Sequence, residues 1–389
     1  MKLKIAVILI LMIVLGGLDN YRELNQLAIV SSISIDKAEN GNYLLSAQII
    51  NTKKSASGTT SGGSSSEVTV FTKESSSIQE GLRDVINESP KKLYIAHMNA
   101  VIISEEVAKE NIDDCVDFFI RDNETGIGQY IIIARDGTKA GDVLKIITPI
   151  ENNSTKNLVQ SIEANLKYQG TVIESTLLNV AKDLLNEDKT IKITACKLIG
   201  DVKSAENKKN LENSETKVDL ILAEIAYFDG LKLKGYLDVN DSKMLNLLND
   251  DIKNTIMFFE IDGYKISFET KSIKSDFKVR FADDHLHMDI DIKSNIVITE
   301  KDSNIEASTE QEIKYIESKF DDYIKTSIKA FLENVKSKYM VDLIGLKNYI
   351  YKYDNKLYNQ VESNYLEEFT YSITSKSSLD TEGGVLKKW

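Results

Sequence analysis

The sequence of 389 residues has few of the side chains on which metal-binding and disulfide-rich folds depend. Its two cysteines, Cys115 and Cys196, lie 81 positions apart and form no CxxC pattern. This spacing excludes a zinc finger, a thioredoxin-type motif and a disulfide-dense scaffold. Both cysteines lie in apolar runs, which favours two buried thiols over the alternative of a single bridge between them.

Catalytic motifs are lacking as well. No segment matches HExxH, GxSxG, a Walker loop or GxGxxG. The 60 acidic residues make carboxylate pairs abundant, but none is distinguished by its surroundings, and no nucleophile has a visible base. We therefore predict a protein that is not an enzyme, with no catalytic residue, no cofactor and no metal site.

The sequence also has no excess of basic residues. Lysine and arginine number 48 against 60 acidic residues, so the net charge is −12. This balance argues against a general nucleic-acid partner, because binding nucleic acid requires a basic face that displaces counterions. With 42% hydrophobic and 28% charged residues, the composition is that of a globular protein, and the length predicts two or three domains.

Long apolar runs are limited to one, Ile5–Leu15, which is shorter than the ~20 residues of a transmembrane helix. Lys2 and Lys4 precede it, as in a secretory signal, whereas a buried N-terminal strand or helix would not explain the two lysines. The sequence thus predicts a location outside the cytoplasm. Val14-Leu15-Gly16 is similar to the first three positions of a bacterial lipobox, but Gly17 stands where that motif has its lipid-bearing cysteine.

The first half predicts strands and helices in mixed order. Asn40-Gly41-Asn42 separates two β-branched runs and indicates a hairpin, while the Gly/Ser/Thr segment 55–66 is typical of a surface loop and lacks the residues of a phosphate cradle. The expected strands are 27–35, 43–50, 68–72, 94–103 and 130–134, and the expected helical stretches are 78–86, 116–120 and 155–185.

The second half predicts a strand-rich region followed by one long helix. The expected strands are 217–227, 231–237, 254–260, 264–270, 276–281 and 286–298, with a short helix near 244–248. Apolar residues such as Ile316, Phe320 and Ile324 then recur at three- and four-residue steps, which predicts an amphipathic helix near 306–338. Its mixed aliphatic and aromatic stripe favours a helix lying across a sheet over a coiled coil. The last 50 residues are Tyr-rich and strand-like.

These patterns predict a multi-domain α+β fold with mixed sheets and packed helices. The expected division is a signal-like segment at 1–18, an N-terminal α+β domain at 19–195, a linker or loop at 196–216, a C-terminal α+β region at 217–375 and a tail at 376–389. A split near residue 300 would divide the C-terminal region into two subdomains.

The three histidines are His97, His285 and His287. In a strand, alternation would place Asp283, His285, His287, Asp289 and Asp291 on one face, where they could ligate a divalent metal ion. A solvated outer face explains the same alternation without a ligand, and we favour it, so both His285 and His287 are expected to face solvent. His97, among apolar neighbours, is expected to be a hydrogen-bonded structural histidine in a strand.

Several segments resemble, in family order from about residue 19 to 375, the Ger(x)C lipoproteins, the C subunits of spore germinant receptors. The opening is similar to that family's Cys-Trp-Asp and Arg-Glu followed by an apolar strand, with Gly17 and Leu18 in place of the cysteine and tryptophan. The similar segments are Asp19 to Val30 with Ile35-Asp36-Lys37, Ser89 to Ser104, Asp117 to Asp122, Ala226 to Phe228 with Leu233 to Leu237, and Lys338 to Leu346.

This resemblance implies a lipid-anchored α+β protein with no known enzymatic activity on the outer face of the spore inner membrane. It implies an A subunit and a permease-like B subunit as partners, with which the chain would respond to small nutrients and trigger germination. Gly17 corresponds to the lipid-attachment position and cannot carry a lipid as written. The alternative function is an extracytoplasmic solute-binding protein that captures a nutrient itself, for which a pocket lined by aromatics with a few placed charges would be expected.

Overall fold

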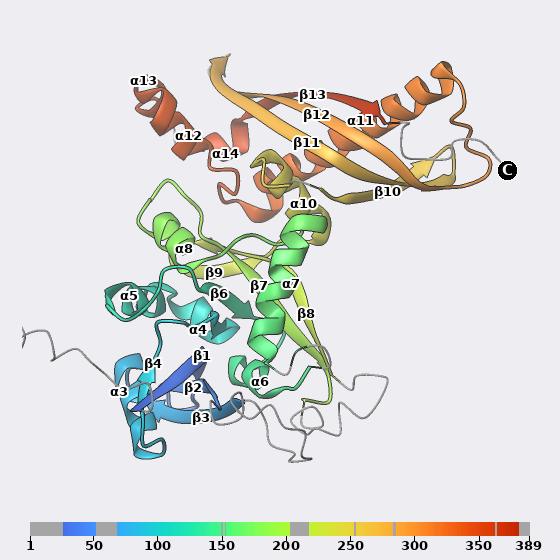
Figure 1. Ribbon diagram of the computed structural model, residues 1–389. Coiled ribbons are helices and arrows are strands. Elements are labelled where there is room, and N and C mark those ends of the chain that lie inside the picture. The colour runs from blue at the N-terminus through green and yellow to red at the C-terminus, as the bar shows by residue number, and fades with distance from the viewer. Residues whose placement is uncertain are drawn as a thin grey trace, which may run out of the picture.

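The computed structural model describes residues 26–51, 68–148, 151, 153–202, 218–252, 254–282, 285–361 and 364–380. It contains two sheets with packed helices and confirms the expected multi-domain α+β fold (Figure 1). The signal-like segment, Gly17, the Gly/Ser loop at 55–66 and Asp283-Asp284 lie outside the described residues.

The first sheet has nine strands, and parallel strands form its middle. Its order is β3-β2-β1-β5-β6-β7-β8-β9, with β4 beside the first residues of β1. β1 pairs antiparallel with β2, whereas the β1–β5, β5–β6 and β6–β7 pairs are parallel. The strands are β1 (Leu27–Lys37), β2 (Tyr43–Ile50), β3 (Val68–Ser75), β4 (Lys92–Tyr94), β5 (Ala100–Ser104), β6 (Tyr130–Ala134), β7 (Lys192–Gly200), β8 (Val218–Asp229) and β9 (Lys232–Tyr236).

Helices cover both faces of this sheet, as parallel strands require. The helices on one face are α3 (Ile78–Asp84), α4 (Glu105–Glu110), α5 (Asp113–Arg121) and α8 (Leu177–Leu184), and those on the other are α6 (Ala140–Lys145) and α7 (Ser154–Tyr168). β5 and β6 are therefore buried along their whole length, and they read as continuous apolar runs.

Part of the α6 side of the sheet is polar although it is buried. Asp36, at the end of β1, is 5% exposed and accepts the backbone N–H groups of Ala140 (2.7 Å) and Gly141 (2.8 Å) at the start of α6. Burial raises the pKa of Asp36, and these two hydrogen bonds oppose the rise. Gly141 leaves little space for a side chain, because a Cβ there would lie 3.1 Å from the Ser46 hydroxyl.

The second sheet has four strands in the order β10-β11-β12-β13. They are β10 (Ile256–Ile261), β11 (Tyr264–Ala282), β12 (His285–Lys301) and β13 (Thr370–Leu379). β11 and β12 form a long antiparallel hairpin, and β13 returns to pair in parallel with β12 at the sheet edge.

The expected long helix is α11 (Glu310–Asn334), which continues into a π-helical turn at Val335–Tyr339. A capping box at Thr309 and Glu312 starts the helix. Its apolar stripe lies across the second sheet: the Phe320 ring is fully buried, with its centroid 5.2 Å from that of Phe268. The prediction of a helix on a sheet is confirmed.

α10 (Val239–Leu248) lies between the two sheets, next to the end of α7 (Figure 1). β8 contributes to both cores through its alternation, since Ala226 and Phe228 pack in the core of the first sheet while Ile225 and Tyr227 pack with residues of the second. β7 and β8, on either side of residues 201–216, pair antiparallel in the first sheet. The domain boundaries stay a prediction.

Three local expectations differ from the structure. The single strand expected at 94–103 is two strands, β4 and β5, with a turn at residues 95–99 between them. The cause is an irregularity of β1 at Ser31, since β4 pairs with β1 before this residue and β5 pairs with β1 after it. The strands expected at 264–270 and 276–281 are one, β11, with an irregularity between Thr270 and Ser272.

The third difference is in the strand-like C-terminal region, where three helices precede β13. They are α12 (Leu346–Tyr353), α13 (Asn355–Tyr358) and α14 (Tyr365–Glu368). The carboxylates of Asp342 and Asp354 accept backbone N–H groups in the first turns of α12 and α13, so local capping overrides the strand propensity of the tyrosines.

Cys115 and Cys196 are free and buried, which confirms the expectation of two buried thiols. Burial raises the pKa of each thiol to about 12. At pH 8 only about one thiol in ten thousand would be ionised, and only the thiolate reacts. We therefore expect no reaction of the native chain with Ellman's reagent within minutes and release of two equivalents in guanidinium chloride. A fast native reaction would contradict the burial of these side chains.

Candidate functional site

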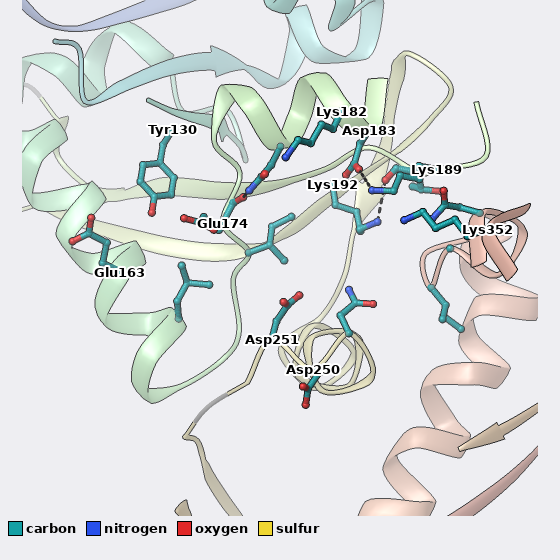
Figure 2. A pocket seen from close by; sticks show the side chains of 18 of the residues that line it. Tyr130, Glu163, Glu174, Lys182, Asp183, Lys189, Lys192, Asp250, Asp251 and Lys352 are labelled. Carbon is teal, nitrogen blue, oxygen red and sulfur yellow. Dashed lines mark hydrogen bonds and ion pairs between the residues drawn. The ribbon is translucent and has the colours of Figure 1, made fainter. Parts of the chain in front are cut away.

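A cleft of about 930 Å³ lies between the first sheet with its helices and the C-terminal part of the chain. One wall comes from α7, α8, β7 and the segments that join them, and the other from residues 249–251 after α10 and from residues of α12 and the segment just before it (Figure 2). Its lining includes Tyr130, Glu163, Lys167, Glu174, Lys182, Asp183, Lys189, Lys192, Asp250, Asp251 and Lys352.

The walls are joined at the α7 end by hydrogen bonds to main-chain carbonyls. The Asn246 amide donates to the carbonyls of Gly170 (2.9 Å) and Val172 (2.8 Å). Gly170 has φ +67°, and a Cβ there would lie 2.8 Å from Ile252. Only glycine combines this conformation with so close an approach.

The walls are joined again at the α12 end. The Asn186 amide donates to Asn348 (2.9 Å), and Asp188 forms an ion pair with Lys347 (2.8 Å) and accepts the hydroxyl of Tyr358 (2.7 Å). Contacts at both ends thus fix the width of the cleft.

Charged groups of both signs line this cleft. The Lys192 ammonium donates to the carbonyl of Thr190 (3.0 Å), and Lys189 forms an ion pair with Asp183 (2.6 Å). Burial lowers the pKa of Lys192, and the negative charges of Asp183 and other nearby aspartates oppose the shift. Burial, together with the neighbouring Asp250, raises the pKa of Asp251.

Five further charged side chains at the cleft are exposed and form no ion pair with any described residue: Glu163, Lys167, Glu174, Lys182 and Lys352. Tyr130 lies at the same end as the two glutamates in Figure 2. Burial raises the pKa of Tyr130 to about 12, with the charges of Glu174 and Glu163 as further causes. The cleft therefore offers acceptors, donors and unpaired charges, but no nucleophile with an adjacent base.

The histidine-bearing strand predicted from the sequence is β12, and its polar face is the outer face of the second sheet. Its side chains pair with hydroxyls of β13 at the same register: His287 Nδ1 lies 2.7 Å from the Thr370 hydroxyl, and Ser372 donates to Asp289 at 2.6 Å. Within the described part of the chain, no group of three or more His, Cys, Asp or Glu residues could hold a metal ion.

This arrangement corrects the expectation for one histidine. The side chain of His287 is 17% exposed, because β13 lies beside it, and it does not project freely into solvent. The side chain of His285, nearer the strand end, is 43% exposed and lies 3.3 Å from Glu368. The neighbouring Asp289 has its pKa lowered to about 2, first by the hydrogen bond from Arg280 and then by that from Ser372.

The expectation for His97 is wrong. This residue lies in the turn between β4 and β5 and is exposed, with its ring packed edge-on against Tyr94 at 5.6 Å. Its apolar sequence neighbours belong to the strands on either side, so they indicated burial that the turn does not provide.

Sequence reasoning singled out none of the charged cleft residues. Lys192 is one lysine among many, and Glu174 and Asp251 follow no motif, because the cleft collects residues from 130 to 352. The only available signal was a lysine within a β-branched strand pattern at Lys192.

Two family descriptions together cover most of the chain. Residues 20–198 match the family described as "Spore germination protein N-terminal domain", and residues 223–383 match "Spore germination B3/ GerAC like, C-terminal". The chain belongs to the GerAC-like family of spore germination proteins.

Two relatives match this chain over nearly their whole length. Spore germination protein KC of Bacillus subtilis (strain 168) is 27% identical, covering 98% of this chain and 96% of the relative. Spore germination protein B3 of the same organism is 22% identical, covering 96% of each chain. The crystal structure of the GerBC protein has a similar fold, with a TM-score of 0.54 and 18% identity over 89% of this chain and 96% of that one.

One GerAC-like segment, Lys338 to Leu346, has a clear structural role. The hydroxyl of Tyr339 donates to the buried carboxylate of Asp241 in α10. The chain then reverses through left-handed residues at Met340 (φ 54°) and Gly345 (φ 78°), and Asp342 caps α12. The segment therefore links α11, α10 and the α12 wall of the cleft.

Proposed function

We propose that this GerAC-like chain is the C subunit of a spore germinant receptor. It acts with the A and B subunits at the outer face of the spore inner membrane to trigger germination in response to nutrients. The observation that carries this proposal is the match of both family descriptions, in order, over residues 20–198 and 223–383. The relatives, named spore germination proteins, match over the same extent.

The chemistry of the described residues supports a role without catalysis. The two thiols are buried, with pKa values raised to about 12, and His287 is held by Thr370 and Asp289 on a sheet face. No helix within the described ranges is both long and apolar enough to cross a bilayer. The absence of enzymatic activity stays a prediction.

Membrane attachment of this chain would differ from that of a lipoprotein, because lipidation requires a thiol that Gly17 lacks. As a helix, the eleven residues Ile5–Leu15 would span about 16 Å, roughly half of a hydrocarbon core about 30 Å thick. Even one acyl chain binds a membrane only marginally. We therefore propose that the A and B subunits supply most of the attachment.

The test uses the full chain expressed in a spore-former grown with labelled fatty acid. We expect no label on the unmodified chain, label on Gly17→Cys, and no label on the control Gly16→Cys, whose thiol is one position out of register. Spore inner membranes should retain the unmodified chain when the A and B subunits are present. The amount of chain bound to these membranes should fall at least tenfold when both subunits are deleted.

Two outcomes would count against the proposal. Acyl label on the unmodified chain would show that the lipobox register is wrong. Equal membrane retention with and without the A and B subunits would contradict the proposal that these subunits attach the chain to the membrane.

A further inference from the structure

Strand β10 is the outermost strand of the second sheet and, within the described part of the chain, pairs only with β11 (Figure 1). The two strands are joined by the two-residue turn Asp262-Gly263, in which both residues have positive φ (53° and 85°). In such a hairpin the strand residues next to the turn form a hydrogen-bonded pair, and every second pair along the ladder is hydrogen-bonded. The main-chain groups of Ile256, Phe258 and Glu260 therefore point away from β11, towards an open edge.

The side chains of β10 alternate between the core and an exposed face. Met257 is 2% exposed, and the ring of Phe259 stacks on that of Tyr323 in α11. On the opposite face Ile256 is 51% and Phe258 is 75% exposed. An open edge strand with exposed apolar side chains is a site at which another strand can pair, and proteins commonly cover such an edge.

A charged side chain lies at each end of this edge. At the start of β10, the half-buried Lys243 of α10 donates to the carbonyl of Ile256 (2.7 Å), and burial lowers the pKa of this lysine. Near the turn, Glu260 is exposed, with Lys265 opposite it on β11. Among the described residues, neither Lys243 nor Glu260 has a partner in an ion pair. Each could therefore accept an opposite charge from another chain.

We infer that β10 is a dimer interface, in which β10 of one copy of this chain pairs antiparallel with β10 of a second copy. Phe258 lies opposite Phe258 of the second copy, on the two-fold axis, and the two residues exchange their main-chain hydrogen bonds. The two second sheets then form one continuous sheet with both α11 helices on the same face. The inference goes beyond the proposed function, which includes no second copy of this chain.

Charge complementarity supports this register. With Phe258 on the axis, Ile256 faces Glu260 of the second copy. The N–H of that glutamate replaces the Lys243 ammonium at the Ile256 carbonyl, and the ammonium turns to the glutamate's carboxylate. Symmetry forms this ion pair twice. An axis at Ile256 would instead bring the two Lys243 side chains together, and an axis at Glu260 would bring the two glutamates together, and both arrangements are repulsive.

The same two charges cannot pair within one copy. Ile256 and Glu260 are four residues apart on an extended strand, roughly 13 Å at about 3.3 Å per residue, and Lys243 is held at the Ile256 end. A strand of a different protein would have to supply an acidic residue at the same offset. The second copy supplies it from its own sequence, which is why we favour a dimer over another partner.

The first test is sedimentation equilibrium of the full chain in a detergent whose micelles match the density of the buffer. We expect a reversible monomer–dimer equilibrium. Phe258→Asp should raise the dimer dissociation constant at least tenfold, because it removes the apolar contact on the axis and places two like charges opposite each other. The matched control is Tyr353→Asp, at a 74% exposed aromatic position of α12, which should leave the dissociation constant unchanged.

Exchanging the two charges tests the proposed ion pair. Lys243→Glu and Glu260→Lys should each weaken the dimer at least fivefold, because each places like charges together at both ends of the interface. The double variant restores opposite charges between the copies and should recover most of the affinity. Glu260 is exposed, so Glu260→Lys and Phe258→Asp still test the interface if Lys243→Glu fails to fold.

Single cysteines test the register. Residues in a hydrogen-bonded antiparallel pair have Cα atoms about 5.5 Å apart, within the range of a disulfide. Phe258→Cys should therefore form a disulfide-linked dimer under mild oxidation. Glu260→Cys should not, because the two positions 260 are four residues out of register. The native Cys115 and Cys196 are buried and do not compete.

Any of three results overturns the inference. The first is a mass of one chain at every loading concentration. The second is association that Phe258→Asp leaves unchanged, which would place the contact elsewhere, for example in the apolar run Ile5–Leu15. The third is a disulfide-linked dimer of Glu260→Cys but not of Phe258→Cys. None of these results bears on attachment to the A and B subunits, so failure here is distinguishable from failure of the proposed function.

Discussion

Replacing Phe320 with alanine is expected to lower the free energy of unfolding by about 3–5 kcal/mol. The ring is fully buried where α11 crosses the second sheet, and its centroid lies 5.2 Å from that of Phe268 and 6.3 Å from that of Phe259. Alanine would remove these edge and tilted ring contacts and leave a cavity that the surrounding sheet cannot fill. Urea unfolding followed by circular dichroism measures the change.

Two further variants on α11 separate packing from helix propensity. Phe320→Leu keeps most of the apolar volume and should cost about 1–2 kcal/mol. Thr326→Ala changes an exposed position of the same helix and should alter stability by less than about 0.5 kcal/mol. A loss below about 1 kcal/mol for Phe320→Ala would show that α11 does not pack on the sheet as described.

Replacing Asp342 with alanine is expected to destabilise the chain by about 3–4 kcal/mol, because several donors lose their acceptor at once. The carboxylate is 8% exposed and accepts the backbone N–H groups of Gly345 (2.8 Å), Leu346 (3.0 Å) and Lys347 (2.9 Å). It also accepts the hydroxyl of Tyr365 at 3.0 Å. Urea unfolding gives the total, and hydrogen exchange of the amides in α12 should increase selectively.

The controls for this prediction preserve shape or change an exposed carboxylate. Asp342→Asn retains one oxygen acceptor and should lose about half as much stability. Asp322→Ala, on the exposed face of α11, removes one surface ion pair with Lys325 and should cost under about 1 kcal/mol. Equal exchange rates in α12 for Asp342→Ala and the unmodified chain would contradict the capping role.

The elements that local pattern could predict are those whose neighbours in space are also neighbours in sequence. The β1–β2 hairpin follows from alternation on both sides of Asn40-Gly41-Asn42, and α11 from its apolar stripe and capping box. The GerAC-like membership could be inferred as well, from short segments in a fixed order. The hairpin and helix signals are each contained within about 30 residues, whereas the family resemblance rests on short segments spread from about residue 19 to 375.

The features that local pattern could not predict depend on contacts between distant segments. β4 and β5 separate only because both pair with β1 on either side of Ser31. The carboxylate of Asp36 is placed by α6, more than 100 positions later, and the cleft residues meet only after α12 has packed against the loop that follows α8. The periodicity of a single sequence does not show which distant segments pair with each other.

The pairing of β13 with β12 has a consequence for the synthesis of the chain. All nine strands of the first sheet lie within residues 27–236, so this sheet can be completed while the ribosome is still translating the remainder. The second sheet instead waits for its last strand, which joins β12 from Thr370 onward. A chain released before that point would present the 17-residue β12 as an open edge, a template for aggregation with other unfinished chains.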